Sequence, residues 1–221
     1  MRSPGGVAEE LQGTRKLSSD TGLDVKAIIL LGTLKRSGLS HTETLSEFLA
    51  ARMARAEVRC ETIRLADYEI PVGTMSDMGS GDQWPGILEK VLDTDILVFA
   101  TPIWWGGHSS LTQRAIERFD ELHDQLLAGK PSGLEGKVGG VVITGDSDGA
   151  QHVIGNVFNF FNAMGLVIPP FASLSVLWDR QAKNTDATRE ALMRKYESDY
   201  ADAAEKMIQQ LVAHAGVERS L

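Results

Sequence analysis

Three aliphatic runs, each ending in a polar segment rich in glycine or hydroxyl side chains, constrain the fold of this chain most strongly. They are Val25–Leu31 (VKAIILL), Ile96–Ala100 (ILVFA) and Lys137–Thr144 (KVGGVVIT). Nearly continuous β-branched and aliphatic runs are typical of strands buried on both faces of a parallel sheet. Apolar residues at helical spacing follow each run, as they would in a chain that alternates strands with helices.

The remaining segments predict two more strands and complete the alternation. Val58–Leu65 alternates like a more exposed strand, and Leu166–Ile168 begins a last strand that Pro169 and Pro170 complicate. Apolar periodicity predicts helices at Thr42–Ala56, Leu111–Leu127, Ala150–Met164 and Asp186–His214. Ile87–Leu92 indicates the end of a further helix. The pattern therefore predicts an α/β fold with a doubly wound five-stranded parallel sheet and helices on both faces.

The ends of the sequence suggest one folded unit behind a polar tail. Residues 1–23 are polar and rich in Gly and Ser, with no apolar core of the kind a signal peptide needs, so we expect a flexible N-terminal tail. Residues 24–221 contain no linker or repeat and would form one domain. No apolar run is long enough to span a membrane, and we expect a cytoplasmic protein.

Charge and metal-ligand spacing exclude several classes of partner. The formal net charge is -8 with no block rich in Lys and Arg, which argues against nucleic-acid binding. The five histidines and the single cysteine lack the spacing of a metal-binding pair, so we predict no protein-ligated metal.

The loop after the first strand, Gly32–Thr42, has the composition of a phosphate-binding loop. It carries four hydroxyl side chains, two cations and two glycines, and it leads into the start of a helix. Free N–H groups and partial positive charge at a helix start favour an anion. The loop lacks the spacing of a P-loop or of a dinucleotide fingerprint. A simple turn capped by Ser40 or Thr42 remains an equal alternative.

The loops after the third and fourth strands complete a candidate ligand site. In Thr101–Ser110, the adjacent Trp104 and Trp105 offer flat aromatic surface for a planar heterocycle, or they pack on a helix or at a subunit interface. Thr144–Gly149 could hydrogen-bond the polar edge of such a ring, or it is a turn chosen for its backbone angles. In parallel sheets these loops meet beyond the carboxyl ends of the strands, where ligands bind.

Gly145–Gly149 also matches G-x-S-x-G, the nucleophile elbow of serine hydrolases. Ser147 would then be the nucleophile, with Asp186 or Asp199 and His214 completing the order of a triad. The two aspartates that flank Ser147 oppose an oxyanion forming beside it, and this alternative leaves the first and third loops unexplained.

The three loops together resemble those of the flavodoxin-like NAD(P)H-dependent FMN reductase and quinone reductase family. Gly32–Lys35 followed by Ser40–Leu45 resembles its Gly-Ser-x-Arg…Ser-Asn-Thr-x-x-Leu phosphate loop, and Thr101–Gly106 resembles its Thr-Pro-x-Tyr-x-Gly isoalloxazine loop. Thr144–Gly145 with Gly149–Gln151 resembles its third flavin loop. The similarity extends from about Val25 to Val176. The chain departs from the pattern in having Thr33 for Ser, Lys35 for Arg, His41 for Asn and Trp104 for Tyr.

This resemblance implies a flavodoxin-like protein that binds FMN non-covalently and uses NAD(P)H as co-substrate. The residues expected to hold the phosphate are Thr33, Lys35, Ser40, His41 and Thr42. Those expected to line the isoalloxazine are Pro102, Ile103, Trp104, Trp105, Gly106, Thr144, Gly145 and Asp146.

The chemistry implied is hydride transfer from NAD(P)H to the flavin, and then electron transfer to a small acceptor such as free flavin or a quinone. The flavin carries this chemistry, so no catalytic side chain is expected. The family implies a homodimer or homotetramer. An electron carrier or flavin-binding module without NAD(P)H turnover is the main alternative.

Overall fold

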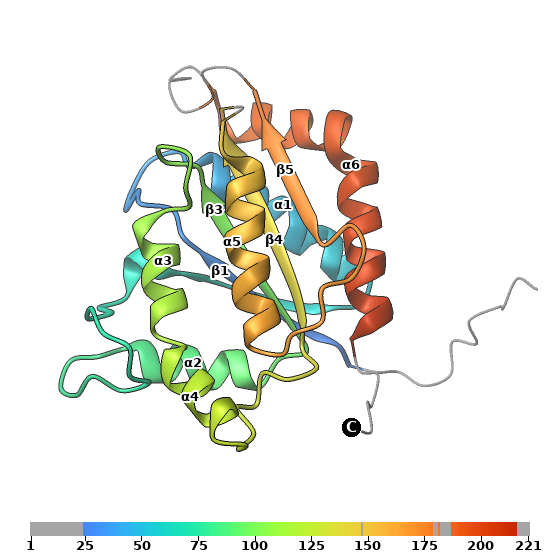
Figure 1. The fold of residues 1–221 in the computed structure, drawn as a ribbon. Coiled ribbons are helices and arrows are strands. Elements are labelled where there is room, and N and C mark those ends of the chain that lie inside the picture. Colours follow the sequence, from blue (N-terminus) through green and yellow to red (C-terminus); the bar gives the residue numbers. More distant parts are fainter. Residues whose placement is uncertain (1–23, 147, 179–180, 182–186, 216–221) are drawn as a thin grey trace, which may run out of the picture.

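A five-stranded parallel sheet runs through the centre of the structure, which is a computed structural model (Figure 1). The described residues are 24–146, 148–178, 181 and 187–215, so the tail predicted over residues 1–23 lies outside them. The strands are β1 (Lys26–Leu31), β2 (Arg59–Arg64), β3 (Ile96–Pro102), β4 (Val138–Gly145) and β5 (Ser173–Leu177). Their order in the sheet is β2-β1-β3-β4-β5, which is the flavodoxin-like arrangement that the family resemblance implies.

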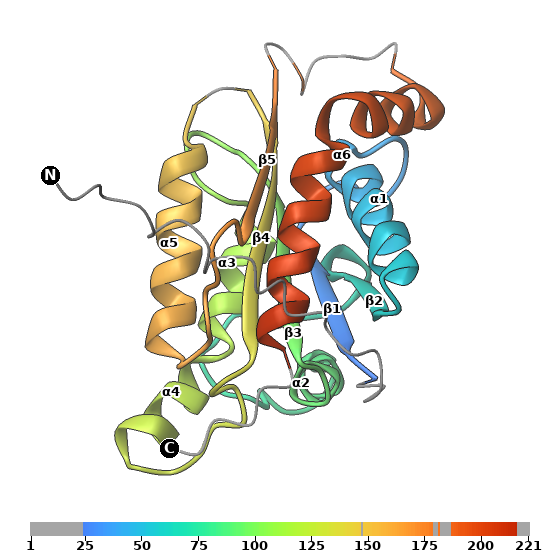
Figure 2. The ribbon, with the colours of Figure 1, turned by 90° about the vertical axis from the view of Figure 1, so that its right-hand side faces the viewer.

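Helices cover both faces of this sheet, as Figure 2 shows. Helices α1 and α6 pack on one face, and the other helices pack on the opposite face. The helices are α1 (His41–Arg55), the short 3-10 helix η1 (Leu65–Asp67), α2 (Trp84–Leu92), α3 (Ser110–Glu117), α4 (Asp120–Leu127), α5 (Ala150–Ala163) and α6 (Arg189–His214).

The aliphatic runs form the central strands because both of their faces are covered. In β1, Ile29 and Leu31 belong to the core under α1 and α6, whereas Ile28 and Leu30 belong to the core on the other face. All four side chains are inaccessible to solvent or nearly so. Strand β2 lies at the edge of the sheet and is mostly exposed, which agrees with its alternating sequence.

The single helix predicted over Leu111–Leu127 is wrong, because α3 ends at Glu117 and α4 starts at Asp120. Arg118 lies at the break, and its side chain is fully buried in an ion pair with Asp82. Its Nε also donates to the carbonyl of Met75, 2.7 Å away. The guanidinium turns inward to hold another segment of the chain, and the helix is interrupted there.

The last strand also lies further along the chain than predicted. Val167 makes only an isolated bridge to Val138, and the regular strand β5 begins at Ser173. The two prolines between them carry no N–H to donate to a strand ladder. The ladder with β4 therefore starts beyond the prolines, where Ser173 pairs with Val141.

Candidate functional site

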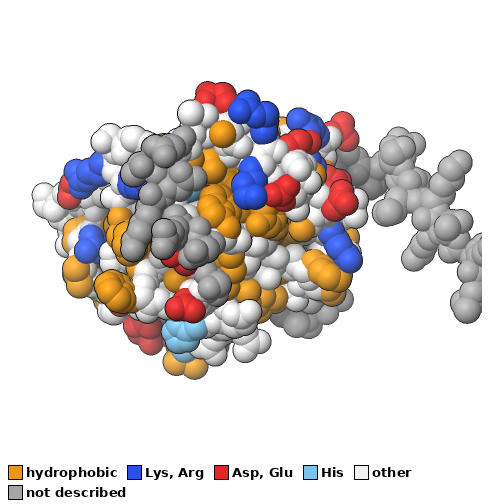
Figure 3. Space-filling view, turned by 90° about the horizontal axis from the view of Figure 1, so that it is seen from above, with side chains coloured by type: hydrophobic (Ala, Val, Ile, Leu, Met, Phe, Trp, Pro, Cys, Tyr) orange, Lys and Arg blue, Asp and Glu red, His pale blue; other side chains and the backbone are white. Residues whose placement is uncertain are grey.

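A cleft of about 330 Å³ opens at the carboxyl edge of the sheet. Viewed from this edge, hydrophobic side chains gather near the middle of the molecular face (Figure 3). The segments after β1 and β3, the carboxyl end of β4, and two described residues beyond β5 form its walls. The lining residues are Thr33, Leu34, Lys35, Leu39, Ser40, His41, Thr42, Pro102, Ile103, Trp104, Thr144, Gly145, Gln181 and Ala187.

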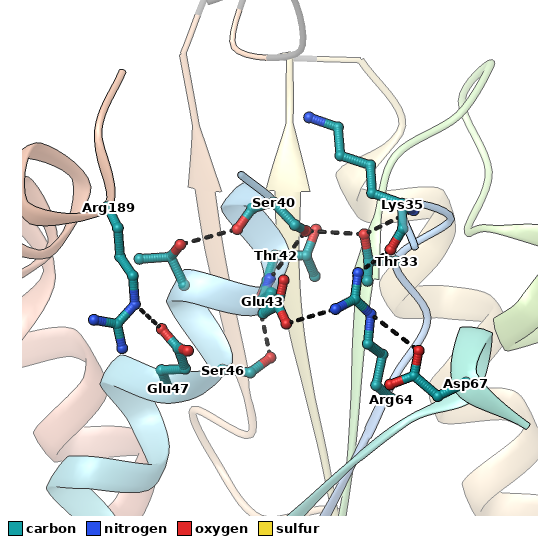
Figure 4. Close-up of polar contacts among 11 residues, drawn as sticks. Thr33, Lys35, Ser40, Thr42, Glu43, Ser46, Glu47, Arg64, Asp67 and Arg189 are labelled. Atoms are coloured by element: carbon teal, nitrogen blue, oxygen red, sulfur yellow. Dashed lines mark hydrogen bonds and ion pairs between the residues drawn. The ribbon is translucent and has the colours of Figure 1, made fainter. Parts of the chain in front are cut away.

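Hydroxyl groups organise the first wall, between β1 and α1 (Figure 4). Ser40 is the N-cap of α1, and its hydroxyl accepts the backbone N–H of Glu43 at 3.3 Å. The same hydroxyl lies 2.9 Å from Oγ1 of Thr33 at the opposite end of the loop. Both side chains are buried, so this contact closes the loop and fixes it at the start of the helix.

The charges around this wall favour an anion. The N-terminus of α1 carries partial positive charge, and Lys35 is close enough for its Nζ to donate to the carbonyl of Leu39 at 2.7 Å. Glu43 lies in the same helical turn, where its charge would repel an anion. Arg64 neutralises it through a 3.0 Å ion pair and also donates to the carbonyl of Lys35 (Figure 4).

His41 presents a polar atom that nothing in the described part of the chain satisfies. Its Nδ1 is buried without a hydrogen-bond partner there. The ring packs against the indole of Trp178, with centroids 5.4 Å apart. Burial and the nearby Lys35 charge lower the pKa of His41 below its ordinary value. A buried orphan nitrogen at a helix start points to a ligand oxygen.

A short hairpin after β3 forms the second wall. Pro102, Ile103 and Trp104 line the cleft, and Trp104 is 48% exposed. Trp105 and Gly106 are outside the lining, although the sequence pattern grouped them with it. The Trp105 side chain is fully exposed.

The carboxyl end of β4 forms the third wall and connects to the first. Oγ1 of Thr144 lies 2.6 Å from Oγ1 of Thr42, and both side chains are buried. Gly145 lines the cleft where a β-carbon would approach the Cβ of Ile103 to 2.9 Å. Asp146 is outside the lining, and its carboxylate instead accepts the backbone N–H of Gln181 at 2.8 Å.

Two described residues beyond β5 supply a fourth wall that the sequence pattern did not predict. Gln181 and Ala187 line the cleft, and the side chain of Gln181 donates to the carbonyl of Val176 at 3.0 Å. Leu34 and Leu39, within the first loop, were also missed. The alternation of Ser173–Leu177 was a usable signal, because a fifth parallel strand must end at the same edge as the other four.

The geometry opposes the serine hydrolase alternative. Ser147 and Asp186 lie outside the described residues. Near its end, α6 packs against the beginning of β4, where a β-carbon on Gly140 would approach Leu211 to 3.3 Å. His214 therefore lies beyond the amino end of β4, whereas Gly145 closes its carboxyl end. His214 thus lies at the opposite edge of the sheet from Gly145 and the cleft.

Two relatives and one solved structure show what the chain is similar to. Over 153 residues, 67% of this chain, it is 37% identical to a divalent metal cation transporter from Mycobacterium bovis, of which it spans 22%. It is 32% identical over 159 residues to 8-demethyl-8-aminoriboflavin-5'-phosphate synthase from Streptomyces davaonensis, of which it spans 62%. The crystal structure of RosB with bound 8-demethyl-8-formylriboflavin-5'-phosphate superposes with a TM-score of 0.61 at 25% identity, over 85% of this chain and 81% of that one.

Both relatives are longer than the stretch they share with this chain. Among the helices of the described residues, none combines the length and apolar character needed to cross a membrane.

The sequence profile of NADPH-dependent FMN reductases matches residues 25–178, which contain β1 to β5 and three of the four walls of the cleft. The chain belongs to the NADPH-dependent FMN reductase family.

Proposed function

We propose that this protein is an FMN-dependent oxidoreductase that takes electrons from NAD(P)H and passes them to a small acceptor. One observation carries the proposal. A single cleft joins a hydroxyl-lined helix start, suited to a phosphate, to the indole of Trp104, suited to a flat ring. These two features lie on different loops of a chain whose family is defined by FMN reduction.

The residues present fit FMN. The orphan Nδ1 of His41 and the free N–H groups of the first turn of α1 would hold the phosphate, with Lys35 adding charge. Pro102, Ile103 and Trp104 would pack on the isoalloxazine, and Thr144 and Gly145 would approach it from β4. The backbone N–H groups of Trp105 and Gly106 stay candidates for hydrogen bonds to its polar edge. Asp146 also stays a candidate, because it directly follows Gly145. Bound FMN would supply reversible two-electron chemistry.

The protein's own contribution is orientation rather than acid-base catalysis. The hydroxyl pairs Thr33–Ser40 and Thr42–Thr144 hold two loops at fixed spacing before a ligand arrives. Preorganised groups of this kind cost no reordering on binding. We further propose a homodimer or homotetramer in the cytoplasm, where NAD(P)H is available, with free flavin, quinones or nitro- and azo-compounds as acceptors.

Absorption spectroscopy tests the cofactor assignment directly. The purified protein is desalted after incubation with FMN, and a retained flavin band is expected. Protein that retains no flavin at excess FMN would overturn the proposal. A matched comparison uses riboflavin, which lacks the phosphate. His41→Ala should weaken FMN binding by about tenfold or more, because it removes a hydrogen bond to a charged group, and leave riboflavin binding nearly unchanged.

Anaerobic reduction separates an enzyme from an electron carrier. NAD(P)H should bleach the bound flavin of a reductase rapidly, whereas a carrier would wait for a separate reductase. The Streptomyces davaonensis relative motivates a second candidate, in which a riboflavin phosphate is the substrate that is modified. Mass spectrometry of the flavin recovered after turnover decides between them. Unchanged FMN mass with NAD(P)H consumed supports the reductase, and an altered flavin mass supports the second candidate.

A further inference from the structure

The hairpin after β3 has a tryptophan where its backbone least favours one. Trp104 and Gly107 exchange two backbone hydrogen bonds, of 2.8 and 2.9 Å. The two residues between them both have positive φ, 49° for Trp105 and 79° for Gly106. This is the pattern of a type I′ turn, in which Asn-Gly is the preferred pair. A bulky residue at the first position is disfavoured because its β-carbon crowds the backbone in the left-handed region.

Packing within the chain does not account for this tryptophan. Trp105 is 103% exposed, so its indole is covered by none of the residues that the structure describes. The neighbouring Trp104 is only about half exposed and forms a wall of the cleft. A large apolar ring on a strained backbone, with no burial to favour it, indicates a role outside the folding of the chain.

The hairpin that carries this indole is rigidly seated. The backbone N–H of Ile103 donates to the carbonyl of Thr144 at 2.8 Å, which extends the pairing of β3 with β4. At Gly149, which has φ +89°, a β-carbon would come within 2.4 Å of the carbonyl oxygen of Gly106. The absence of a side chain there lets the two loops touch. Trp105 is therefore held at a fixed place, one residue from the cleft wall.

We infer that Trp105 is a stacking surface for the planar, electron-poor ring that exchanges electrons with the cofactor. The inference rests on the proposed function. An indole face is electron-rich and attracts flat, electron-poor or cationic rings. A reactant that enters and leaves in each cycle needs a surface that is uncovered in the free protein, and Trp105 is such a surface. The oxidised nicotinamide left after hydride transfer to the flavin and the quinones that accept electrons from it share this ring chemistry.

Trp105→Asn is the decisive variant because asparagine is favoured at its turn position. It removes the ring and relieves the backbone, so the melting temperature should stay level or rise. The FMN-loaded variant is titrated with NADP+ and, separately, with a naphthoquinone, and binding is followed by the flavin absorbance. Affinity for one or both should fall about three- to tenfold, which is the usual worth of one aromatic stacking contact. Trp105→Phe should restore most of the loss.

Phe171 provides a matched control on the opposite edge of the sheet. It too is a non-glycine residue in the left-handed region, with φ 60°, and it is 56% exposed just before β5. Phe171→Asn should leave both titrations unchanged. Loss of NADP+ affinity alone identifies Trp105 as the nicotinamide surface, and loss of quinone affinity alone identifies it as the acceptor surface.

Three results would overturn the inference while leaving the proposed function intact. Trp105→Asn could bind both rings as tightly as the wild type. It could lose FMN itself, which would make Trp105 part of the cofactor pocket. Sedimentation could show that it dissociates an oligomer, which would make the indole a subunit contact. Wild-type protein that retains no FMN would instead refute the proposed function and this inference together.

Discussion

The loops after β2 and β3 are held in place by opposite kinds of contact. The β2 loop, residues 68–83, is held by a buried charge, since Arg118 pairs with Asp82 and binds the carbonyls of Met75 and Pro71. The β3 loop, residues 103–109, is seated where side chains are missing, against Gly145 and Gly149. A loop held by side chains commits those side chains to structure. A loop held by its backbone leaves Trp104 and Trp105 free to meet a ligand.

Removing the charged anchor should have the largest effect. Arg118→Ala leaves the carboxylate of Asp82 buried without its partner, so the free energy of unfolding should fall by about 3–5 kcal/mol. Urea denaturation measures the loss. Lys90→Ala is the control, because it breaks the exposed pair with Glu61 and should change little. A loss for Arg118→Ala as small as that of the control would remove the distinction between the two loops.

Adding one methyl group at Gly149 should displace the β3 loop. Gly149→Ala places a β-carbon against the backbone of Gly106 at a positive φ, so we expect a loss of about 2–4 kcal/mol together with weaker FMN binding. Thermal unfolding and flavin titration measure the two effects. Gly155→Ala within α5 is the matched control, because its β-carbon meets nothing within 4 Å. It should stabilise the protein by about 0.5–1 kcal/mol. Equal behaviour of the two variants would contradict the seating argument.

The hydroxyl pair between α1 and β4 is a third kind of anchor and sharpens the comparison. Thr42→Val leaves the buried hydroxyl of Thr144 without this partner, and a loss of about 1–2 kcal/mol is expected in chemical denaturation. Replacing both threonines by valine should cost less than the single change, because no hydroxyl is then left unpaired. A double variant less stable than the single one would show that the pair has further partners.

Lowering the pH should reduce the stability of the protein through His41 and Asp82 over different pH ranges. These are the smallest effects expected. His41 has a lowered pKa, caused by burial and by Lys35, so the unfolded chain binds more protons. Stability should therefore fall as pH drops below the ordinary value of 6.5. His41→Asn should flatten the melting temperature of the apo protein between pH 7 and 5.

Asp82 acts in the same sense as His41 but at lower pH, because its pKa is lowered from a smaller ordinary value. Burial opposes its charge, but hydrogen bonds from Arg118 and two backbone N–H groups outweigh this and lower its pKa. Its stabilising contribution is present above the ordinary value of 3.8 and is lost only as pH falls below it. Asp82→Asn removes the titrating group, so its melting temperature should depend on pH between 7 and 5 as that of the wild type does, and a different dependence in that range would contradict this assignment.

The sequence predicted the fold well where one local signal decided the structure. The central strands β1, β3 and β4 follow from their continuous aliphatic runs, because only strands covered on both faces tolerate them. The break at Arg118 depends on a partner 36 residues earlier in the chain, which no local period records. The position of β5 depends on pairing with β4, and the short alternation at Ser173–Leu177 is weak by itself.

The candidate site shows the same division. The hydroxyls and the aromatic residue of three loops were predicted because their residue types are unusual after buried strands. The contribution of Gln181 was not, because glutamine in a loop has no distinctive pattern and only the placement of β5 brings it to the cleft. The outward position of Trp105 comes from a turn conformation, which the side-chain sequence alone does not specify.

The helix α6 has a consequence for how the chain is made. One face of the sheet is completed by Leu192, Tyr196, Met207 and Leu211 of this helix, which lie in the same core as β1 and α1. A ribosome adds about 5–20 residues per second, so several seconds separate the release of β5 from that of the end of α6. Throughout that interval the part of this face that α1 does not cover stays apolar and exposed. Molecular chaperones that recognise such surfaces should bind the nascent chain in this interval and leave once α6 has docked.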